Sequence, residues 1–166
     1  MARQLTLVLG GSRSGKSAVA ERLAEPLGDV TYVATAVFDP ADADWDRRIS
    51  CHRARRPQRW GTVEIGRAGD LARPVAAIAG PVLVDSLGTW VAGHPDFVVD
   101  ARGLVAALGG RAQPTIVVSD EVGMGVHPST SGGRQFRDAL GDVNRLVADV
   151  SDRVLLVVAG RTLALT

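Results

Sequence analysis

The 166-residue sequence contains a single cysteine, Cys51, and few aromatic side chains. One cysteine excludes an internal disulfide framework and a cysteine-rich metal site. Aromatic residues make up 4% of the chain and apolar residues 46%, so Val, Leu, Ala and Ile must build the core. Such a composition favours buried parallel strands that are covered by helices.

An excess of charge and long apolar runs are also missing. The net charge of +1 gives no global electrostatic reason to expect a nucleic acid or a membrane surface as a partner. No apolar run reaches the length of a membrane span, and the N-terminus lacks a signal-peptide pattern. We therefore expect one cytoplasmic domain that covers residues 1–166 and binds no nucleic acid.

Lysine is the scarcest basic residue, because the chain has 18 arginines and only Lys16. This lysine lies in a segment that fits the phosphate-binding pattern G-x-x-x-x-G-K-[ST] at every fixed position. In that pattern backbone N–H groups cradle the phosphates, Lys16 reaches the β- and γ-phosphates, and Ser17 binds Mg²⁺. The residues predicted to bind a nucleotide here are Gly10, Gly11, Ser12, Arg13, Ser14, Gly15, Lys16 and Ser17.

The neighbours of this segment decide between a phosphate site and a glycine-rich turn with an exposed lysine. Residues 4–9 have the composition of a short buried strand, and residues 17–27 carry apolar side chains at helical spacing. Strand, loop and helix follow one another in the order that the motif requires. The sequence therefore predicts a nucleoside triphosphate site in which Lys16 is a catalytic residue.

Apolar runs typical of strands alternate with segments of helical spacing along the rest of the chain. The predicted strands are 5–9, 30–34, 82–85, 115–119 and 154–159; the predicted helices are 17–27, part of 41–56, 71–78, 104–108 and 136–150. Alternation of this kind predicts an α/β fold with a mostly parallel central sheet and helices on both faces. Ligands of such sheets bind beyond the carboxyl ends of the strands.

Two acidic segments follow predicted strands. Asp85 ends the strand 82–85, which favours a role in holding Mg²⁺ together with Ser17, although it could instead cap the next helix. Ser119, Asp120 and Glu121 follow the strand 115–119. Both a substrate or switch loop and an ordinary connection fit this second segment.

Six arginines surround His52 between Arg47 and Arg59. Such a cluster can be a solvated face, a nucleic-acid patch or an additional phosphate-binding surface. Nearby positive charge lowers the pKa of a histidine and favours neutral imidazole, the nucleophilic form. His52 could then attack the α-phosphate of a nucleotide, but an exposed histidine in a basic helix and a nucleophilic Cys51 fit the residues as well.

The chain resembles the bifunctional adenosylcobinamide kinase/adenosylcobinamide-phosphate guanylyltransferases of cobalamin biosynthesis. The resemblance extends over nearly the whole chain, and its most specific parts are the His52 block and the Glu-Val-Gly-Met-Gly block. The segments that carry it are Gly10–Ser17, Tyr32–Ala36, Arg48–Glu64, Glu121–Pro128 and Gly133–Asn144. Asp120 departs from the pattern, since many relatives have asparagine before Glu-Val-Gly.

The resemblance implies a RecA-like P-loop fold, a homotrimer and two reactions. First, ATP or GTP phosphorylates the aminopropanol hydroxyl of adenosylcobinamide. Second, His52 takes up GMP from GTP and passes it to the product, which gives adenosylcobinamide-GDP. The resemblance also implies nucleotide contacts by Thr35, Ala36, Val37, Arg53, Ala54, Arg55, Arg56, Glu64 and Asp85. A P-loop kinase for another small alcohol, or a nucleotide-dependent regulatory module, would fit the P-loop alone.

Overall fold

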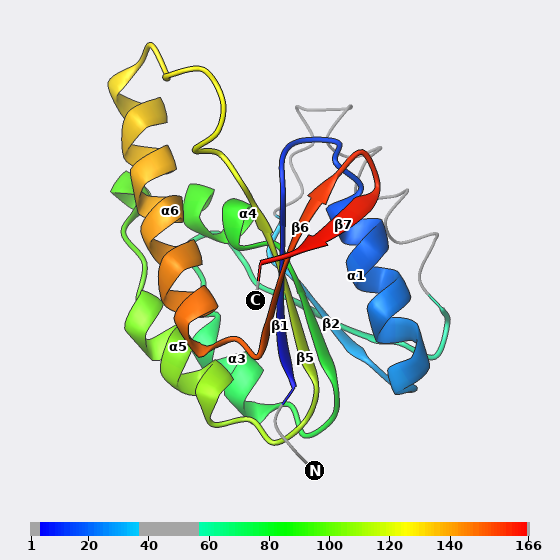
Figure 1. Ribbon diagram of the computed structural model, residues 1–166. Coiled ribbons are helices and arrows are strands. Elements are labelled where there is room, and N and C mark those ends of the chain that lie inside the picture. The colour runs from blue at the N-terminus through cyan, green and yellow to red at the C-terminus, as the bar shows by residue number, and fades with distance from the viewer. Residues whose placement is uncertain (1–3, 37–56, 166) are drawn as a thin grey trace.

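The computed structural model describes residues 4–36 and 57–165 (Figure 1). Seven strands form one sheet in the order β3-β2-β4-β5-β1-β6-β7. All neighbouring strands are parallel except β7, which is antiparallel to β6. The strands are β1 (Leu5–Gly10), β2 (Thr31–Ala34), β3 (Gly61–Glu64), β4 (Val82–Asp85), β5 (Thr115–Asp120), β6 (Arg153–Val158) and β7 (Arg161–Ala164).

Helices cover both faces of this sheet. In Figure 1, α1 lies on one side, and α3, α4, α5 and α6 lie on the other. The helices are α1 (Lys16–Ala24), α3 (Ala72–Ala77), α4 (Leu87–Ala92), α5 (Ala101–Gly109) and α6 (Ser131–Val150), with short 3₁₀ turns η1 (Glu25–Leu27) and η2 (Pro95–Phe97). Among the described residues, no helix is both long and apolar enough to cross a membrane.

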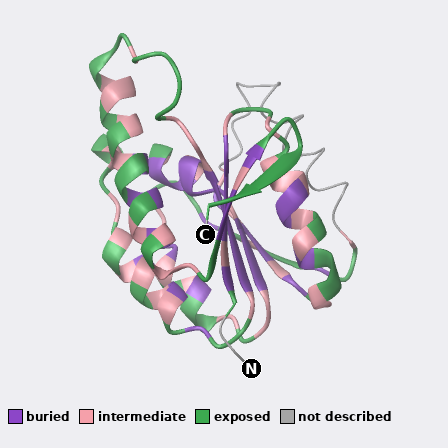
Figure 2. Ribbon diagram, in the orientation of Figure 1, coloured by how far each residue is buried: buried purple, intermediate pink, exposed green. Residues whose placement is uncertain are grey.

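The core has two halves because successive side chains of a strand point to opposite faces of the sheet. Leu7 and Leu9 of β1 pack in the half that α3, α4, α5 and α6 cover, whereas Val8 packs against Val19 and Ala20 of α1. The central strands are accordingly buried almost throughout (Figure 2). This two-sided burial explains why they appear in the sequence as continuous apolar runs.

The expected α/β architecture is confirmed, and each of the five predicted strands is present within a residue or two of its predicted ends. The sequence interpretation missed β3, β7 and α4. Every residue of β7 is exposed, so this strand lacks the continuous apolar run of a strand that is buried on both faces. Helix α6 begins at Ser131 rather than near residue 136, because the Thr130 hydroxyl accepts a hydrogen bond from Gly133 N at 3.1 Å. The helix expected within 41–56 lies outside the described residues.

Candidate nucleotide-binding site

The predicted phosphate-binding loop connects the buried strand β1 to helix α1. Gly15 precedes the helix with φ 89°, a left-handed conformation that favours glycine. Ser14 fixes the loop from three sides: its N–H donates to Gly11 O at 3.2 Å, its hydroxyl accepts from Lys16 N at 3.3 Å, and its carbonyl accepts from Gly160 N at 2.7 Å. Gly160 lies in the turn between β6 and β7, so this hairpin supports the loop.

Within the described residues, the ammonium of Lys16 has one partner in β5 and one in the loop. Its ammonium forms an ion pair with Asp120 Oδ1 at 2.6 Å and donates to Gly11 O at 3.3 Å. The two side chains of the ion pair are 13% and 29% exposed, so both are shielded yet reachable from solvent. The predicted catalytic lysine therefore lies at the carboxyl edge of the sheet, in the loop where the motif places it.

Strand pairing explains why Asp120 meets Lys16. Strand β5 lies between β1 and β4, and its residue Asp120 is in register with Gly10, the first residue of the loop. The sequence interpretation named the segment 119–121 but gave Asp120 no role. The only local signal was a carboxylate at the end of an apolar strand, and the pairing with Lys16 depends on the strand order.

Asp85 ends β4 and is in register with Val118, so it lies one strand further from the loop than Asp120. Its Oδ2 accepts a hydrogen bond from the Tyr32 hydroxyl at 2.9 Å. The alternative that Asp85 caps the next helix is wrong. Ser86 is the N-cap of α4, and its hydroxyl accepts from Thr89 N at 3.4 Å.

Thr35 is buried, and its hydroxyl is engaged within the protein. The hydroxyl donates to Ser86 O at 2.6 Å, accepts from Ser86 N at 2.9 Å and lies 2.5 Å from the Thr89 hydroxyl. These bonds tie the end of β2 to the start of α4. The predicted contact of Thr35 with a nucleotide stays a prediction.

The other predicted nucleotide contacts are distant from the loop or outside the described residues. Glu64 ends β3 in register with Ala34 and is exposed. Four strand spacings of about 4.8 Å separate β3 from β1, so the backbone of Glu64 is roughly 19 Å from Val8, the residue of β1 in its register. Ala36 directly follows Thr35. The predicted residues outside the described part are Val37, His52, Arg53, Ala54, Arg55 and Arg56, together with the rival nucleophile Cys51.

The oxygen donors at this edge fit Mg²⁺ chemistry. Ser17 supplies a hydroxyl, and Asp85 and Asp120 supply carboxylates at the ends of adjacent strands. Within residues 4–36 and 57–165, no group of three His, Cys, Asp or Glu side chains could hold a metal by itself. Mg²⁺ bound with a nucleotide needs no such cage, because it takes only one or two protein ligands beside phosphates and waters.

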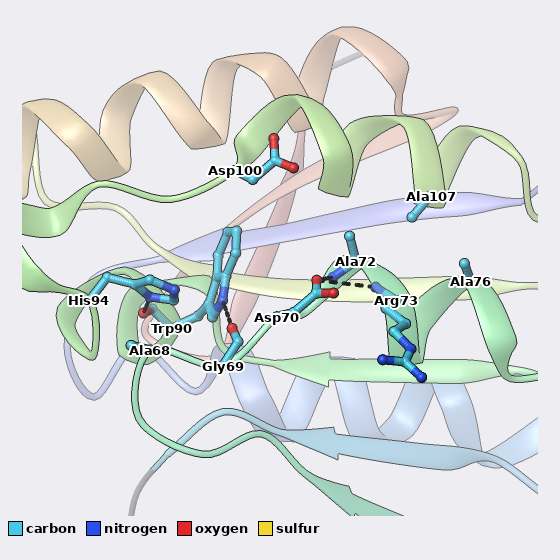
Figure 3. Close-up of a pocket in the computed structure, with 10 residues that line it drawn as sticks. All are labelled: Ala68, Gly69, Asp70, Ala72, Arg73, Ala76, Trp90, His94, Asp100 and Ala107. Atoms are coloured by element: carbon cyan, nitrogen blue, oxygen red, sulfur yellow. Dashed lines mark hydrogen bonds between the residues drawn. The ribbon is translucent and has the colours of Figure 1, made fainter.

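A separate hollow of about 500 Å³ lies among α3, α4 and α5 (Figure 3). Three of its polar side chains have structural partners. Asp70 caps α3 through Ala72 N at 2.9 Å, Asp100 caps α5 through Gly103 N at 2.8 Å, and Trp90 Nε1 donates to Gly69 O at 3.0 Å. These side chains cap helices or bind backbone, and the hollow has no phosphate-binding motif, so the phosphate-binding loop remains the candidate site.

A phosphate-binding loop between a buried strand and a helix, at the carboxyl edge of a mostly parallel sheet, defines a P-loop nucleotide-binding protein. More specifically, residues 6–165 match the family described as "Cobinamide kinase / cobinamide phosphate guanyltransferase", and the chain belongs to that family. The resemblance seen in the sequence is thereby confirmed.

Two relatives and one solved structure show the extent of the similarity. The chain is 39% identical over 163 residues to the "Bifunctional adenosylcobalamin biosynthesis protein CobP" of Pseudomonas aeruginosa, covering 93% of this chain and 92% of the relative. It is 34% identical over 178 residues to the CobU protein of the same description from Escherichia coli, covering 94% and 96%. The fold is similar to that of an ATPase from the type III secretion system of pathogenic bacteria. That similarity has a TM-score of 0.56 at 14% identity, covers 92% of this chain and 50% of the ATPase, and confirms the RecA-like P-loop fold.

Proposed function

We propose that the chain phosphorylates adenosylcobinamide and then transfers GMP from GTP to the product, giving adenosylcobinamide-GDP in cobalamin biosynthesis. Family membership over residues 6–165 supports both activities. The observation that carries the proposal is the preformed phosphate loop with Lys16 at its mouth, at the edge of the sheet where ligands bind.

In the first reaction the aminopropanol hydroxyl attacks the γ-phosphorus of ATP or GTP. A bond forms between that oxygen and phosphorus, the bond to the bridging β–γ oxygen breaks, the hydroxyl loses its proton to solvent, and a nucleoside diphosphate leaves. The backbone N–H groups of residues 10–15 orient the phosphates, and Lys16 offsets the negative charge on the transferring group. Ser17 and Asp85 would hold Mg²⁺, which adds further positive charge there.

In the second reaction a ring nitrogen of His52 attacks the α-phosphorus of GTP. The N–P bond forms, the bond to the β-phosphate oxygen breaks, and pyrophosphate leaves. A phosphate oxygen of cobinamide phosphate then attacks the same phosphorus and releases His52. Covalent catalysis divides one displacement into two easier ones. In this proposal the guanine nucleotide is held by Thr35, Ala36, Val37, Arg53, Ala54, Arg55, Arg56, Glu64 and Asp85.

Transfer of label from GTP tests the second reaction. GTP labelled at the α-phosphate should leave acid-labile label on the wild-type protein, because phosphorus bound to histidine nitrogen hydrolyses in acid. His52→Ala should abolish this label but retain γ-phosphoryl transfer to adenosylcobinamide, since the P-loop is unchanged.

The matched control is Cys51→Ser, which alters the neighbouring rival nucleophile and should keep the label. Absence of label on the wild-type protein would contradict guanylyl transfer. Label that persists in His52→Ala but disappears in Cys51→Ser would assign the nucleophile to the cysteine. Phosphoryl transfer to a different small alcohol, with none to adenosylcobinamide, would instead favour a simpler P-loop kinase.

We further propose that the enzyme acts in the cytoplasm as a homotrimer, as a single domain spanning residues 1–166. Its partners are then the corrinoid and the nucleotides, with no nucleic acid. The net charge of +1 supports the absence of a nucleic-acid partner, because it gives no general attraction to phosphate backbones.

A further inference from the structure

The ion pair between Lys16 and Asp120 brings opposite charges together inside the phosphate-binding loop. An ammonium group has three N–H donors, and two of those of Lys16 are directed at Asp120 Oδ1 and Gly11 O. The motif requires the same ammonium to reach the β- and γ-phosphates. Nucleotide binding must therefore redirect donors that the protein itself already uses.

Asp120 is held in place from several elements. Its carbonyl accepts from Asn144 Nδ2 of α6 at 3.0 Å, and its Oδ2 accepts from the Ser86 hydroxyl at 3.4 Å. Asn144 is buried and also accepts from the Ser119 hydroxyl at 2.6 Å. These bonds fix both the backbone and the carboxylate, so Asp120 is an anchored partner and not a mobile surface acid.

The first turn of α4 also leaves space for this carboxylate. Gly88 is buried, and a Cβ atom built on it would overlap Asp120 Oδ2. A side chain at position 88 would therefore push the carboxylate away from its position. The strand, α4 and α6 thus define one location for Asp120, and in this location it meets the ammonium of Lys16.

We propose that Asp120 is a positioning residue that holds the ammonium of Lys16 in the nucleotide-free loop. The phosphates of the bound triphosphate then replace Asp120 as the partner of this ammonium. This inference rests on the proposed nucleotide chemistry of the loop. The Asp120 carboxylate and the phosphates are both anionic and compete for the same ammonium, so Asp120 limits the affinity for the triphosphate. Asp120 keeps the sole lysine directed into the loop and makes its release a part of nucleotide binding.

The NMR signal of the Lys16 side chain reports directly on this ion pair. Protein labelled with ¹³Cε,¹⁵Nζ-lysine should give one side-chain lysine signal, because Lys16 is the only lysine. Without nucleotide, the ammonium of the wild-type protein should exchange its protons slowly, since two acceptors hold it. Asp120→Asn should shift the signal and speed the exchange, whereas GTP should shift the wild-type signal to a new position.

Asp142→Asn is the matched control, because it makes the same charge change at an exposed position of α6. The Lys16 signal of this variant should coincide with that of the wild-type protein. Identical lysine signals in the wild-type protein and Asp120→Asn would overturn the proposal.

Calorimetric titration with GTP in EDTA measures how strongly Asp120 competes with the phosphates for Lys16 when no metal is present. Asp120→Asn should bind GTP about two- to fivefold more tightly than the wild-type protein, the upper part of the range for loss of a partly shielded ion pair. In the Lys16→Met background the same substitution should change affinity less than twofold, because the lysine is no longer there to be released.

Each other outcome contradicts the inference in its own way. Weaker binding by Asp120→Asn only when Mg²⁺ is present would make Asp120 a metal ligand. An equal gain in GTP affinity with and without Lys16 would show that Asp120 acts only by repelling the phosphates. A kcat that falls while affinity is unchanged would make it a base for the acceptor hydroxyl. If the wild-type protein binds no GTP, the proposed function fails instead, whereas the lysine signals still report on the ion pair.

Discussion

At the scale of single residues, Thr35 organises the edge of the sheet through one buried hydroxyl. This hydroxyl bonds both to the N–H and to the carbonyl of Ser86, so the end of β2 is tied to the first residue of the β4–α4 junction. A buried polar group that loses its partner carries the full cost of its removal from water. The contribution of Thr35 to stability is therefore separable from any contact with a nucleotide.

Thr35→Val should lower the free energy of unfolding by about 1 kcal/mol, because Ser86 N then keeps only its 3.4 Å contact with the Thr89 hydroxyl, whereas Ser86 O keeps its bonds from Thr89 and Trp90. Thr35→Ser keeps the hydroxyl and should cost clearly less. Urea denaturation followed by circular dichroism measures both variants. Equal losses of stability in the two variants would show that the methyl group, and not the hydroxyl, makes the contribution.

At the scale of elements, Arg111 joins parts of the chain that share no helix or strand. Its guanidinium donates to the carbonyls of Val75, Ile78 and Gly80, and its Nε donates to the Thr115 hydroxyl at 2.8 Å. The residue is buried, and desolvation lowers the pKa of its guanidinium. Arg111 thus satisfies the carbonyls at the end of α3 and attaches the entry to β4 to the start of β5.

Arg111→Met should lower the free energy of unfolding by about 2–4 kcal/mol, since the apolar chain fills similar space but leaves several carbonyls without their donor. Arg145→Met is the matched control. The side chains of Arg145 and its partner Asp149 are 65% and 64% exposed, so Arg145→Met should lower the free energy of unfolding by no more than about 0.5 kcal/mol. Chemical denaturation compares the two, and a similar small effect in both would contradict the bridging role of Arg111.

At the scale of the whole molecule, the hairpin of β6 and β7 leaves apolar side chains exposed in the described part of the chain. Val158 of β6, Leu163 of β7 and Leu165, which follows β7, are 60%, 59% and 52% exposed. An exposed edge strand with apolar side chains favours association with another chain. This surface is consistent with the proposed homotrimer.

Size-exclusion chromatography with light scattering should give a mass of three chains for the purified protein, because apolar surface of this kind is stable when another copy covers it. The mass should stay at that value over a tenfold dilution. A mass of one chain at every concentration would contradict the homotrimer and leave the enzymatic proposal intact.

Local patterns in the sequence were sufficient for much of the fold. The phosphate loop was predictable because its glycines, Lys16 and Ser17 act within one short segment. The central strands were predictable because burial on both faces produces continuous apolar runs. By contrast, among the described strands β7 pairs with β6 alone, and it is exposed along its length, so its formation depends on that partner more than on its own residues.

The phosphate-binding loop, the alternation of strands and helices, and the family resemblance all follow from residues that are close together in the chain. The contact of Lys16 with Asp120, and not with Asp85, follows from the fold. Strand order and parallel register set which residues are neighbours at a sheet edge, and neither can be derived from a local pattern. Because β5 lies between β1 and β4, the carboxylate of Asp120 is beside the loop, and the carboxylate of Asp85 is further away by one strand.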